Sequence, residues 1–159
     1  MAKTAMAALK ELVDSEEFLA SIRFTTPSGA AASGAYFQKP PDDVDLSTGD
    51  VFIFDFKSES WDYTTESILK NLTCSVIAYC NSFERADQIV QPALEDVLMD
   101  AESRITILGH ESYNLTILQV MKGLLDVEDK VGNPVYFVEL ELQLEYQRKR
   151  RGSDDAFSD

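Results

Sequence analysis

The sequence predicts an α+β fold: a mostly antiparallel sheet of four to five strands with a long C-terminal hairpin, packed against one or two helices. Three segments carry this prediction. Residues 138–147 alternate strictly between apolar and polar types, residues 83–101 repeat apolar types at helical spacing, and residues 72–80 are apolar on both faces. A period of two is typical of a half-buried strand, and a period of 3.6 is typical of an amphipathic helix.

The closing hairpin is the most regular of these elements. Residues 138–147 place apolar side chains on one face and glutamate or glutamine side chains on the other, which predicts one buried and one wet face. Gly132 and Asn133 tolerate positive φ and favour a turn before this strand. Segments 114–126 and 135–147 are therefore predicted to form a long antiparallel hairpin.

Two helices are predicted on the same grounds. The first covers residues 3–14, where Thr4 is suited to accept the first free backbone amides. The second covers residues 83–101 and contains Pro92, which removes one backbone hydrogen bond and predicts a kink.

The remaining elements are predicted less directly. Residues 51–58 alternate around three phenylalanines and predict a strand, and residues 72–80 suit a central strand. A connector with one helical turn is expected over 61–70, and a short strand over 104–109.

Two segments lack a sustained period. Residues 25–50 are rich in Gly, Ala, Ser, Pro and Asp and predict a long loop or arm, because loops of this length inside a domain are usually functional or disordered. Residues 148–159 carry four cations and three anions and predict a flexible polar tail. One α/β domain is expected over 1–147.

The net charge of the chain narrows the range of possible functions. The net charge is −14, and the tail contributes +1 (four cations less three anions), so residues 1–147 hold −15. Surfaces that grip nucleic acid need clustered Lys and Arg, which argues against specific DNA or RNA binding. An acidic wall suits a channel that DNA passes through without adhering.

Membrane insertion and a disulfide are not expected. No run approaches the roughly 20 apolar residues that cross a bilayer, so we expect a soluble chain made in the cytoplasm. Cys74 and Cys80 lie six positions apart in one predicted strand, about 20 Å at the usual rise per residue, which is too far for a disulfide.

Residue types for catalysis are sparse. His110 is the single histidine, so neither a zinc site nor a Ser-His-Asp or Cys-His group can be assembled around it with local support. The acidic run at 126–129 lacks the alternation of a calcium loop and suits a hairpin turn. We therefore expect no enzyme activity, cofactor or metal.

One strand carries more apolar surface than one layer of helix covers. By simple alternation, segment 114–126 carries apolar residues on both faces, and either the first helix or another subunit must cover the second set. The candidate interface residues are Leu115, Ile117 and Met121 on one face and Leu118, Val120 and Leu124 on the other. The 25–50 segment is a second candidate surface, through Pro40, Pro41, Asp42 and Asp43.

The order of elements resembles the tail terminator, or tail completion, proteins of long-tailed bacteriophages. The resemblance covers about 51–147 and is carried by LTCSVIAYC, by the following NSFERADQIVQPALEDVLMD helix, by RITILG, and by LTILQVMKGLLDVEDKVGNPVYFVELELQLEY. The long 25–50 segment and the polar end depart from compact members of the family, and leave open whether the tail is contractile or flexible.

The resemblance implies a structural virion protein of the tail–neck region, assembled in the host cytoplasm. It implies a homo-oligomer, a hexameric ring, that docks on the last ring of tail tube protein, stops its polymerisation and contacts neck or head-completion proteins, with the sheath as a further partner. DNA would pass its lumen, for which Glu139, Glu141 and Glu145 are the acidic candidates.

Two alternatives remain open at this stage. The first is a head-to-tail neck protein, either adaptor or stopper, on a similar small scaffold. The second is a small enzyme or ligand-binding domain that uses Glu139, Glu141 and Glu145, although like charges on a wet strand more often serve solubility and edge protection.

Overall fold

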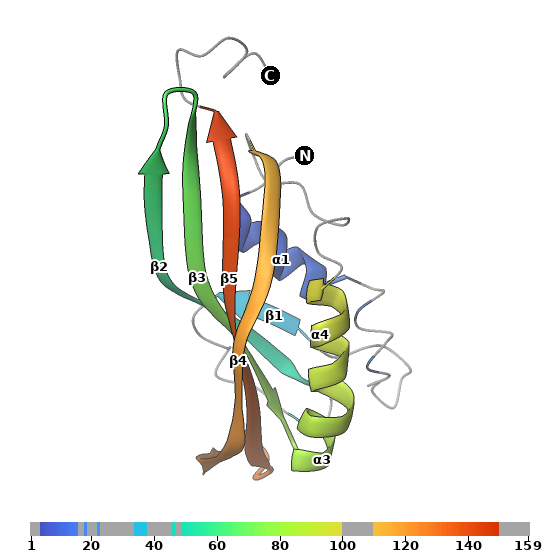
Figure 1. Ribbon diagram of the computed structural model, residues 1–159. Coiled ribbons are helices and arrows are strands. Elements are labelled where there is room, and N and C mark those ends of the chain that lie inside the picture. Colours follow the sequence, from blue (N-terminus) through green and yellow to red (C-terminus); the bar gives the residue numbers. More distant parts are fainter. Residues whose placement is uncertain are drawn as a thin grey trace.

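The computed structural model describes residues 4–15, 18, 22, 34–37, 46, 49–99 and 110–149. One five-stranded sheet of order β1-β2-β3-β5-β4 organises them, with the helices packed on one face (Figure 1). The strands are β1 (Gly34–Phe37), β2 (Val51–Tyr63), β3 (Ser67–Cys80), β4 (His110–Glu128) and β5 (Pro134–Lys149). The predicted α+β class is confirmed.

The sheet is antiparallel except at one edge, where β1 runs parallel to the first residues of β2. β3 pairs with β5 without interruption from Ser67 opposite Lys149 to Cys80 opposite Tyr136. The central position of the strand at 72–80 and the long C-terminal hairpin are both confirmed.

The first helix, α1 (Ala5–Val13), begins where the sequence predicts. Thr4 adopts an extended conformation and its hydroxyl accepts a hydrogen bond from the Ala7 amide. This bond satisfies one of the amides that a helix start leaves free. Leu9, Leu12 and Val13 are buried on the side that faces the sheet.

The second helix contains a wide turn that the sequence alone does not specify. It consists of α3 (Phe83–Arg85), a π-helical segment η1 (Ala86–Val90) and α4 (Gln91–Met99). The Gln91 amide donates to the Ala86 carbonyl, one residue further back than in an α-helix. Pro92 follows directly, and a locally widened turn relieves the clash of its ring with the preceding turn. The predicted irregularity at Pro92 takes this form.

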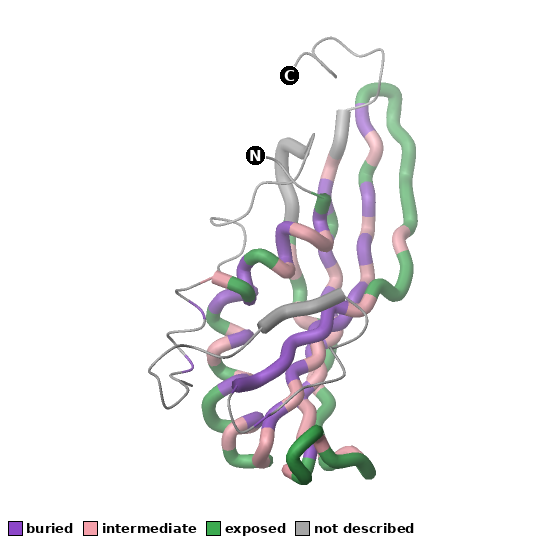
Figure 2. The backbone as a smooth tube through the Cα atoms, turned by 180° about the vertical axis from the view of Figure 1, so that it is seen from behind, coloured by how far each residue is buried: buried purple, intermediate pink, exposed green. Residues whose placement is uncertain are grey.

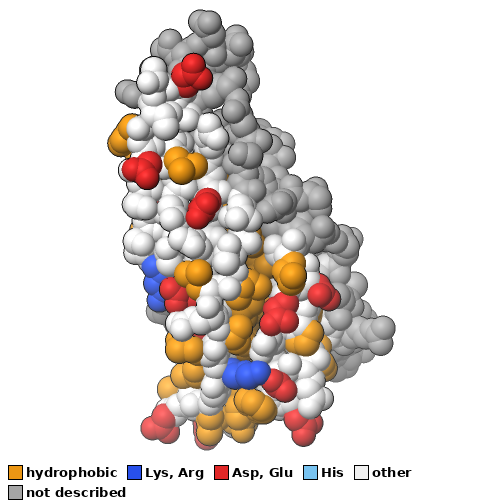
Figure 3. All heavy atoms as spheres, in the orientation of Figure 1, with side chains coloured by type: hydrophobic (Ala, Val, Ile, Leu, Met, Phe, Trp, Pro, Cys, Tyr) orange, Lys and Arg blue, Asp and Glu red, His pale blue; other side chains and the backbone are white. Residues whose placement is uncertain are grey.

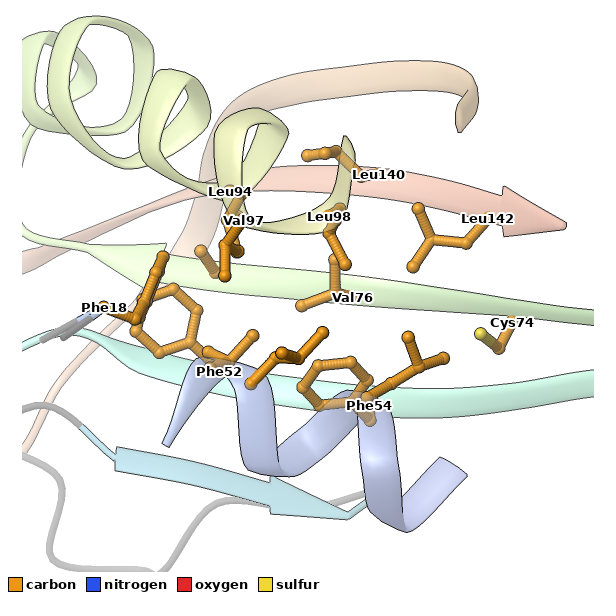
Figure 4. Close-up of a cluster of buried hydrophobic side chains, with 14 of the residues drawn as sticks. Phe18, Phe52, Phe54, Cys74, Val76, Leu94, Val97, Leu98, Leu140 and Leu142 are labelled. Atoms are coloured by element: carbon orange, nitrogen blue, oxygen red, sulfur yellow. The ribbon is translucent and has the colours of Figure 1, made fainter. Parts of the chain in front are cut away.

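The main core lies between the helices and one face of the sheet. Figure 4 shows side chains from α4, β2, β3 and β5 pointing toward one another, and Phe18 meets Phe52 edge to face at 5.3 Å between ring centroids. We call this side of the sheet the core face. Its buried strand residues are Phe52, Phe54, Leu72, Cys74, Val76, Ala78, Cys80, Val138, Leu140, Leu142, Leu144 and Tyr146.

A buried ion pair joins the start of β2 to the second helix. The Asp50 carboxylate accepts hydrogen bonds from Arg85 Nη2 at 2.7 Å and Nε at 2.9 Å, and Arg85 also donates to the Ile22 carbonyl. Burial raises the pKa of Asp50, although Arg85 acts in the opposite direction. Arg85 thus ties three separate segments together at one end of the core.

The structure departs from two sequence predictions about connections. The expected loop at 25–50 contains β1 at Gly34–Phe37, and the buried Leu46. The strand pairs with the start of β2, a tertiary contact that four residues in a Gly/Ala/Ser segment do not reveal. Residues 61–70, expected as a connector with a helical turn, are the two arms and the turn of the β2–β3 hairpin. Trp61 and Tyr63 extend β2, and Thr64 closes the turn onto Ser67.

Three other predictions concern residues at or beyond the described limits. β5 continues to Lys149, two residues past the predicted end of the strand at 147. The expected short strand at 104–109 and the rest of the polar tail lie outside the described residues, as do Pro40, Pro41, Asp42 and Asp43.

The sheet has a covered half and a bare half. Toward the β4–β5 turn, the helices cover one face, and Leu46 packs on Val51, Ile53 and Val135 of the other face. Toward the β2–β3 turn, residues 56–71 extend beyond the helices, and most of β2 there is exposed (Figure 2). We call residues 56–71 the projecting hairpin.

Candidate subunit interface

β4 forms one edge of the sheet over 19 residues, and within the described chain it pairs only with β5. Its outer backbone amides and carbonyls therefore face away from the sheet. A long open edge of this kind is a template for pairing with another chain. Figure 3 shows hydrophobic side chains gathering along the lower part of β4 and beside the second helix.

A β-bulge at Leu118 changes which residues of β4 share a face. Ile117 lies opposite Leu142, and Gln119 lies opposite Glu141, so Leu118 is an extra residue in the ladder. A bulge shifts the alternation by one residue, which moves the following side chains to the other face. The predicted grouping of the six interface residues is therefore wrong.

The observed grouping puts most of the apolar residues of β4 on the core face. Leu115, Ile117 and Val120 are partly buried against the main core, and Leu124 lies on the same face in register with Tyr136. Met121 lies on the opposite face in register with Glu139. Leu118, Met121 and Leu124 are exposed, and they are the interface candidates of β4 that the chain leaves to solvent.

Lys122 lies on the core face and links β4 to the second helix. Its ammonium donates to Gln91 Oε1 at 2.9 Å, forms an ion pair with Asp87, and lies 5.9 Å from the centroid of the Phe83 ring. The lower part of β4 is thereby held in place, although its outer edge remains open.

The β4–β5 turn is held by one carboxylate. Asp129 accepts hydrogen bonds from the amides of Leu46, Val131 and Asn133 and from the Asn133 side chain, at 2.7 to 3.1 Å. Desolvation raises the pKa of Asp129, but these donors outweigh it and hold the pKa below its ordinary value. Gly132 has a φ of 89°, as the sequence predicts for this turn.

The projecting hairpin carries an ordered aromatic cluster on the core face. Glu59 accepts hydrogen bonds from Trp61 Nε1 at 2.5 Å and from the Tyr146 hydroxyl at 3.2 Å. The Lys70 ammonium lies 4.4 Å from the centroid of the Trp61 ring and 4.0 Å from Glu59. Tyr63 packs edge to face on Trp61. We call Glu59, Trp61, Tyr63, Lys70 and Tyr146 the tip cluster.

The tip cluster combines fixed geometry with exposure. Trp61 is 48 % exposed and Tyr63 is 62 % exposed, whereas Lys70 and Tyr146 are buried beneath them. Burial, together with the nearby Glu59 charge, raises the pKa of Tyr146, so its hydroxyl stays protonated and continues to donate. Exposed, pre-ordered Trp and Tyr side chains are typical of residues that dominate protein interfaces.

The three glutamates predicted to line a lumen share the face opposite the core. Glu139 accepts from the Ser75 hydroxyl at 3.2 Å, Glu141 accepts from Gln119 Nε2 at 2.9 Å, and Glu145 is exposed. Asp55 on β2 lies on the same side, in register with Ser75. We call this side of the sheet the acidic face. Toward the β2–β3 turn, none of the described helices covers it.

No group of three or more His, Cys, Asp or Glu side chains in the described part is arranged to hold a metal ion. Cys74 and Cys80 are both free and buried, as expected from their positions in one strand. Burial and the Asp55 charge raise the pKa of Cys74 to about 12. Among the described helices, none is long and apolar enough to cross a bilayer.

Comparison with known proteins finds similarity at the level of the fold. No protein-family model matches the sequence, and no curated protein matches it. A solved structure titled "Virion of native gene transfer agent (GTA) particle" contains a chain of similar fold, with a TM-score of 0.54 and 17 % sequence identity. The similarity covers 91 % of this chain and 95 % of that chain. The chain therefore shares the fold of a virion component over nearly its whole length.

The tip cluster is the feature that sequence reasoning missed. Trp61 and Tyr63 alternate with Asp62, and this signal could have extended the predicted strand, although the bulge next to Lys57 puts it out of phase with the phenylalanines of β2. The turn at 64–66 contains no Gly, Pro or Asn, so the usual marker of a hairpin was absent.

Proposed function

We propose that this chain is a structural protein of a tailed-phage-like virion that forms a ring, caps the tail tube and presents a surface to the neck of the head. The observation that carries the proposal is the presence of separate open surfaces on one rigid sheet: the exposed edge and side chains of β4, and the projecting hairpin with its tip cluster. A ring with head-to-tail contacts needs two different surfaces on each copy.

The fold relative supports a place in a virion. The similar chain belongs to a gene transfer agent virion, and the match leaves little of either chain unaligned. Apart from β1, the described elements follow one another as helix, strand, strand and helix, and long closing hairpin, and this order supports the resemblance to tail terminators.

Charge supports a lumen through which DNA slides. The whole chain carries −14, and Glu139, Glu141, Glu145 and Asp55 lie together on the acidic face. Turned inward in a ring, this face repels phosphate and favours passage over adhesion. Glu139 and Glu141 already have protein donors, so their carboxylates hold fixed positions along the sheet.

A length assay tests the capping role. Tail tube protein of the same virus is polymerised in the presence of increasing amounts of this chain, and tube lengths are measured by negative-stain imaging. We expect shorter tubes of defined length with the chain at one end. Unchanged lengths at saturating chain would contradict the proposal.

The same assay separates the closest alternative, a neck protein of the adaptor or stopper type. The tip cluster and the open β4 edge suit that role as well, because it also requires ring formation. A neck protein would leave tube elongation unchanged and would bind only tubes that are already capped.

A further inference from the structure

We infer that neighbouring copies join edge to edge, with β4 of one copy pairing antiparallel to the outer half of β2 of the next, so that one continuous sheet runs around the ring. This inference rests on the proposed ring-forming function and names the surfaces that would build the ring. The partner is a second copy of this chain.

The two strands are the open edges on opposite sides of the sheet. β1 pairs with β2 only as far as Phe54, so from Asp55 to Tyr63 the outer side of β2 has no strand beside it in the described chain. β4 is open on the other side. The side chains of residues 56–58 and 60–63 of β2 are exposed, as are most of those of β4 from Asn114 onward, and no described element covers either edge.

Strand direction allows this pairing in a ring. β2 is antiparallel to β3, β3 to β5, and β5 to β4, so β2 and β4 run in opposite directions. If the ring axis is parallel to the strands, rotation about it leaves the direction of each strand unchanged from copy to copy. The strands that meet between copies are therefore antiparallel, which is the slightly more stable arrangement.

On the core face, apolar side chains of β2 and β4 lie at the same height along the strands. Phe56 is level with Cys74, Leu142 and Ile117 across the sheet, and Glu59 is level with Leu72, Leu144 and Leu115. Pairing would bring the half-exposed Phe56 and the tip cluster of one copy beside the partly buried Leu115 and Ile117 of the next. Aromatic and aliphatic cross-strand neighbours of this kind stabilise antiparallel pairs.

The edges also carry features that limit pairing with unrelated strands. β2 has a bulge next to Lys57, and β4 has a bulge at Leu118. Bulges and edge lysines hinder indiscriminate pairing at the edge of a sheet. Closing a sheet into a ring also requires a stagger between its first and last strands, so the two edges can meet several residues away from level.

In this arrangement, the acidic faces of all copies lie on the same side of the continuous sheet. Because every copy presents the same face to the axis, the helices of all copies lie on one side of the continuous sheet and Glu139, Glu141 and Glu145 lie on the other. With the helices outside, the glutamates face the lumen.

Cysteine crosslinking tests the inference directly. Ser60 on β2 and Asn114 on β4 are exposed, lie on the acidic face and are level through Asn71 and Glu145. We would combine Ser60→Cys with Asn114→Cys, Thr116→Cys or Gln119→Cys in three double variants, to allow for stagger. Each is oxidised at high concentration and on tubes of the same virus, then separated under denaturing conditions. The native thiols are buried and do not compete.

We expect one double variant to give a ladder of covalent species that ends at the ring size. The matched control replaces Ser60→Cys by Thr73→Cys, on the acidic face of the central strand β3, and should give no ladder. Each single variant should give no species above the dimer. Native mass spectrometry of the unmodified chain, free and on tubes, reports ring formation independently.

Three outcomes overturn the inference. Rings without a ladder from any double variant would exclude edge pairing and leave the proposed function intact. Efficient dimerisation of Thr116→Cys alone would indicate a symmetric β4–β4 contact instead. A chain that stays monomeric both free and with tubes would remove the proposed ring itself.

Discussion

The two halves of the long sheet share the pairing of β2, β3, β5 and β4 but differ in their surroundings. In the covered half, Phe54 is 1 % exposed between the helices and the sheet, whereas Phe56, two residues further along the same face of β2, is 50 % exposed. β3 and β5 continue without interruption through both halves. The hydrogen-bonded ladder therefore supports the bare half, and helix packing stabilises only the covered half.

The difference separates stability from assembly. Residues of the covered half should determine the free energy of unfolding, because their burial within one chain is nearly complete. Residues of the bare half should contribute little to folding and much to contacts between chains. A domain that needed only to be stable would gain nothing from a pre-ordered Trp61 and Tyr63 beyond the reach of its helices.

A pair of substitutions on β2 tests most sharply whether the two halves differ in their contribution to stability. Phe54→Ala should lower the free energy of unfolding by about 3–5 kcal/mol, because it leaves a cavity in a close-packed core. Phe56→Ala should lower it by less than about 1 kcal/mol. Urea denaturation followed by circular dichroism measures both, and equal losses would show that the halves do not differ.

The buried ion pair gives the next largest effect. Asp50→Asn should cost about 3 kcal/mol, because Arg85 keeps its charge in a buried site beside a neutral amide. Asp14→Asn is the matched control, since the Lys10–Asp14 pair is exposed on α1 and should change stability by less than about 0.5 kcal/mol. Thermal unfolding of the two variants compares them, and a loss below about 1 kcal/mol for Asp50→Asn would be inconsistent with a structural role for the pair.

The β4–β5 turn supplies a pH-dependent effect. The pKa of Asp129 is lowered in the folded chain, so its contribution is present above the unfolded pKa of about 3.9 and is lost as pH falls through the folded pKa. Asp129→Asn should therefore cost about 1 kcal/mol at pH 7. The gap to the wild type should close near pH 2, and a gap that persists there would contradict this account.

The smallest effect on stability should accompany a large effect on assembly. Trp61→Ala should change the free energy of unfolding by less than about 1 kcal/mol, because its ring is half exposed, yet it should abolish ring formation or tube capping. Leu69→Ala, on the other face of the same hairpin and also exposed, is the control and should leave assembly unchanged. Native mass spectrometry and the tube-length assay compare the two variants.

Periodicity predicted the elements whose pattern is local. The alternation from Val138 to Tyr146 and the helical spacing around Val90 and Leu94 each give the observed element within a few residues. The fold class follows from these elements and their order.

Features set by tertiary contact were not predictable in the same way. β1 has four residues whose pairing depends on the start of β2, and the bulge at Leu118 is specified by the register against Glu141 and Leu142. One extra residue exchanged the faces of Met121 and Leu124, so the candidate interface was named correctly as a strand but sorted wrongly by face.

Hydrogen–deuterium exchange of the free and the assembled chain tests the central claim most directly. The bare half and the β4 edge serve neighbouring chains, so backbone amides in residues 55–63 and in β4 should become strongly protected when the ring forms, while those in the central strand β3 stay as slow as before. Unchanged exchange at both edges in the assembled ring would contradict the claim.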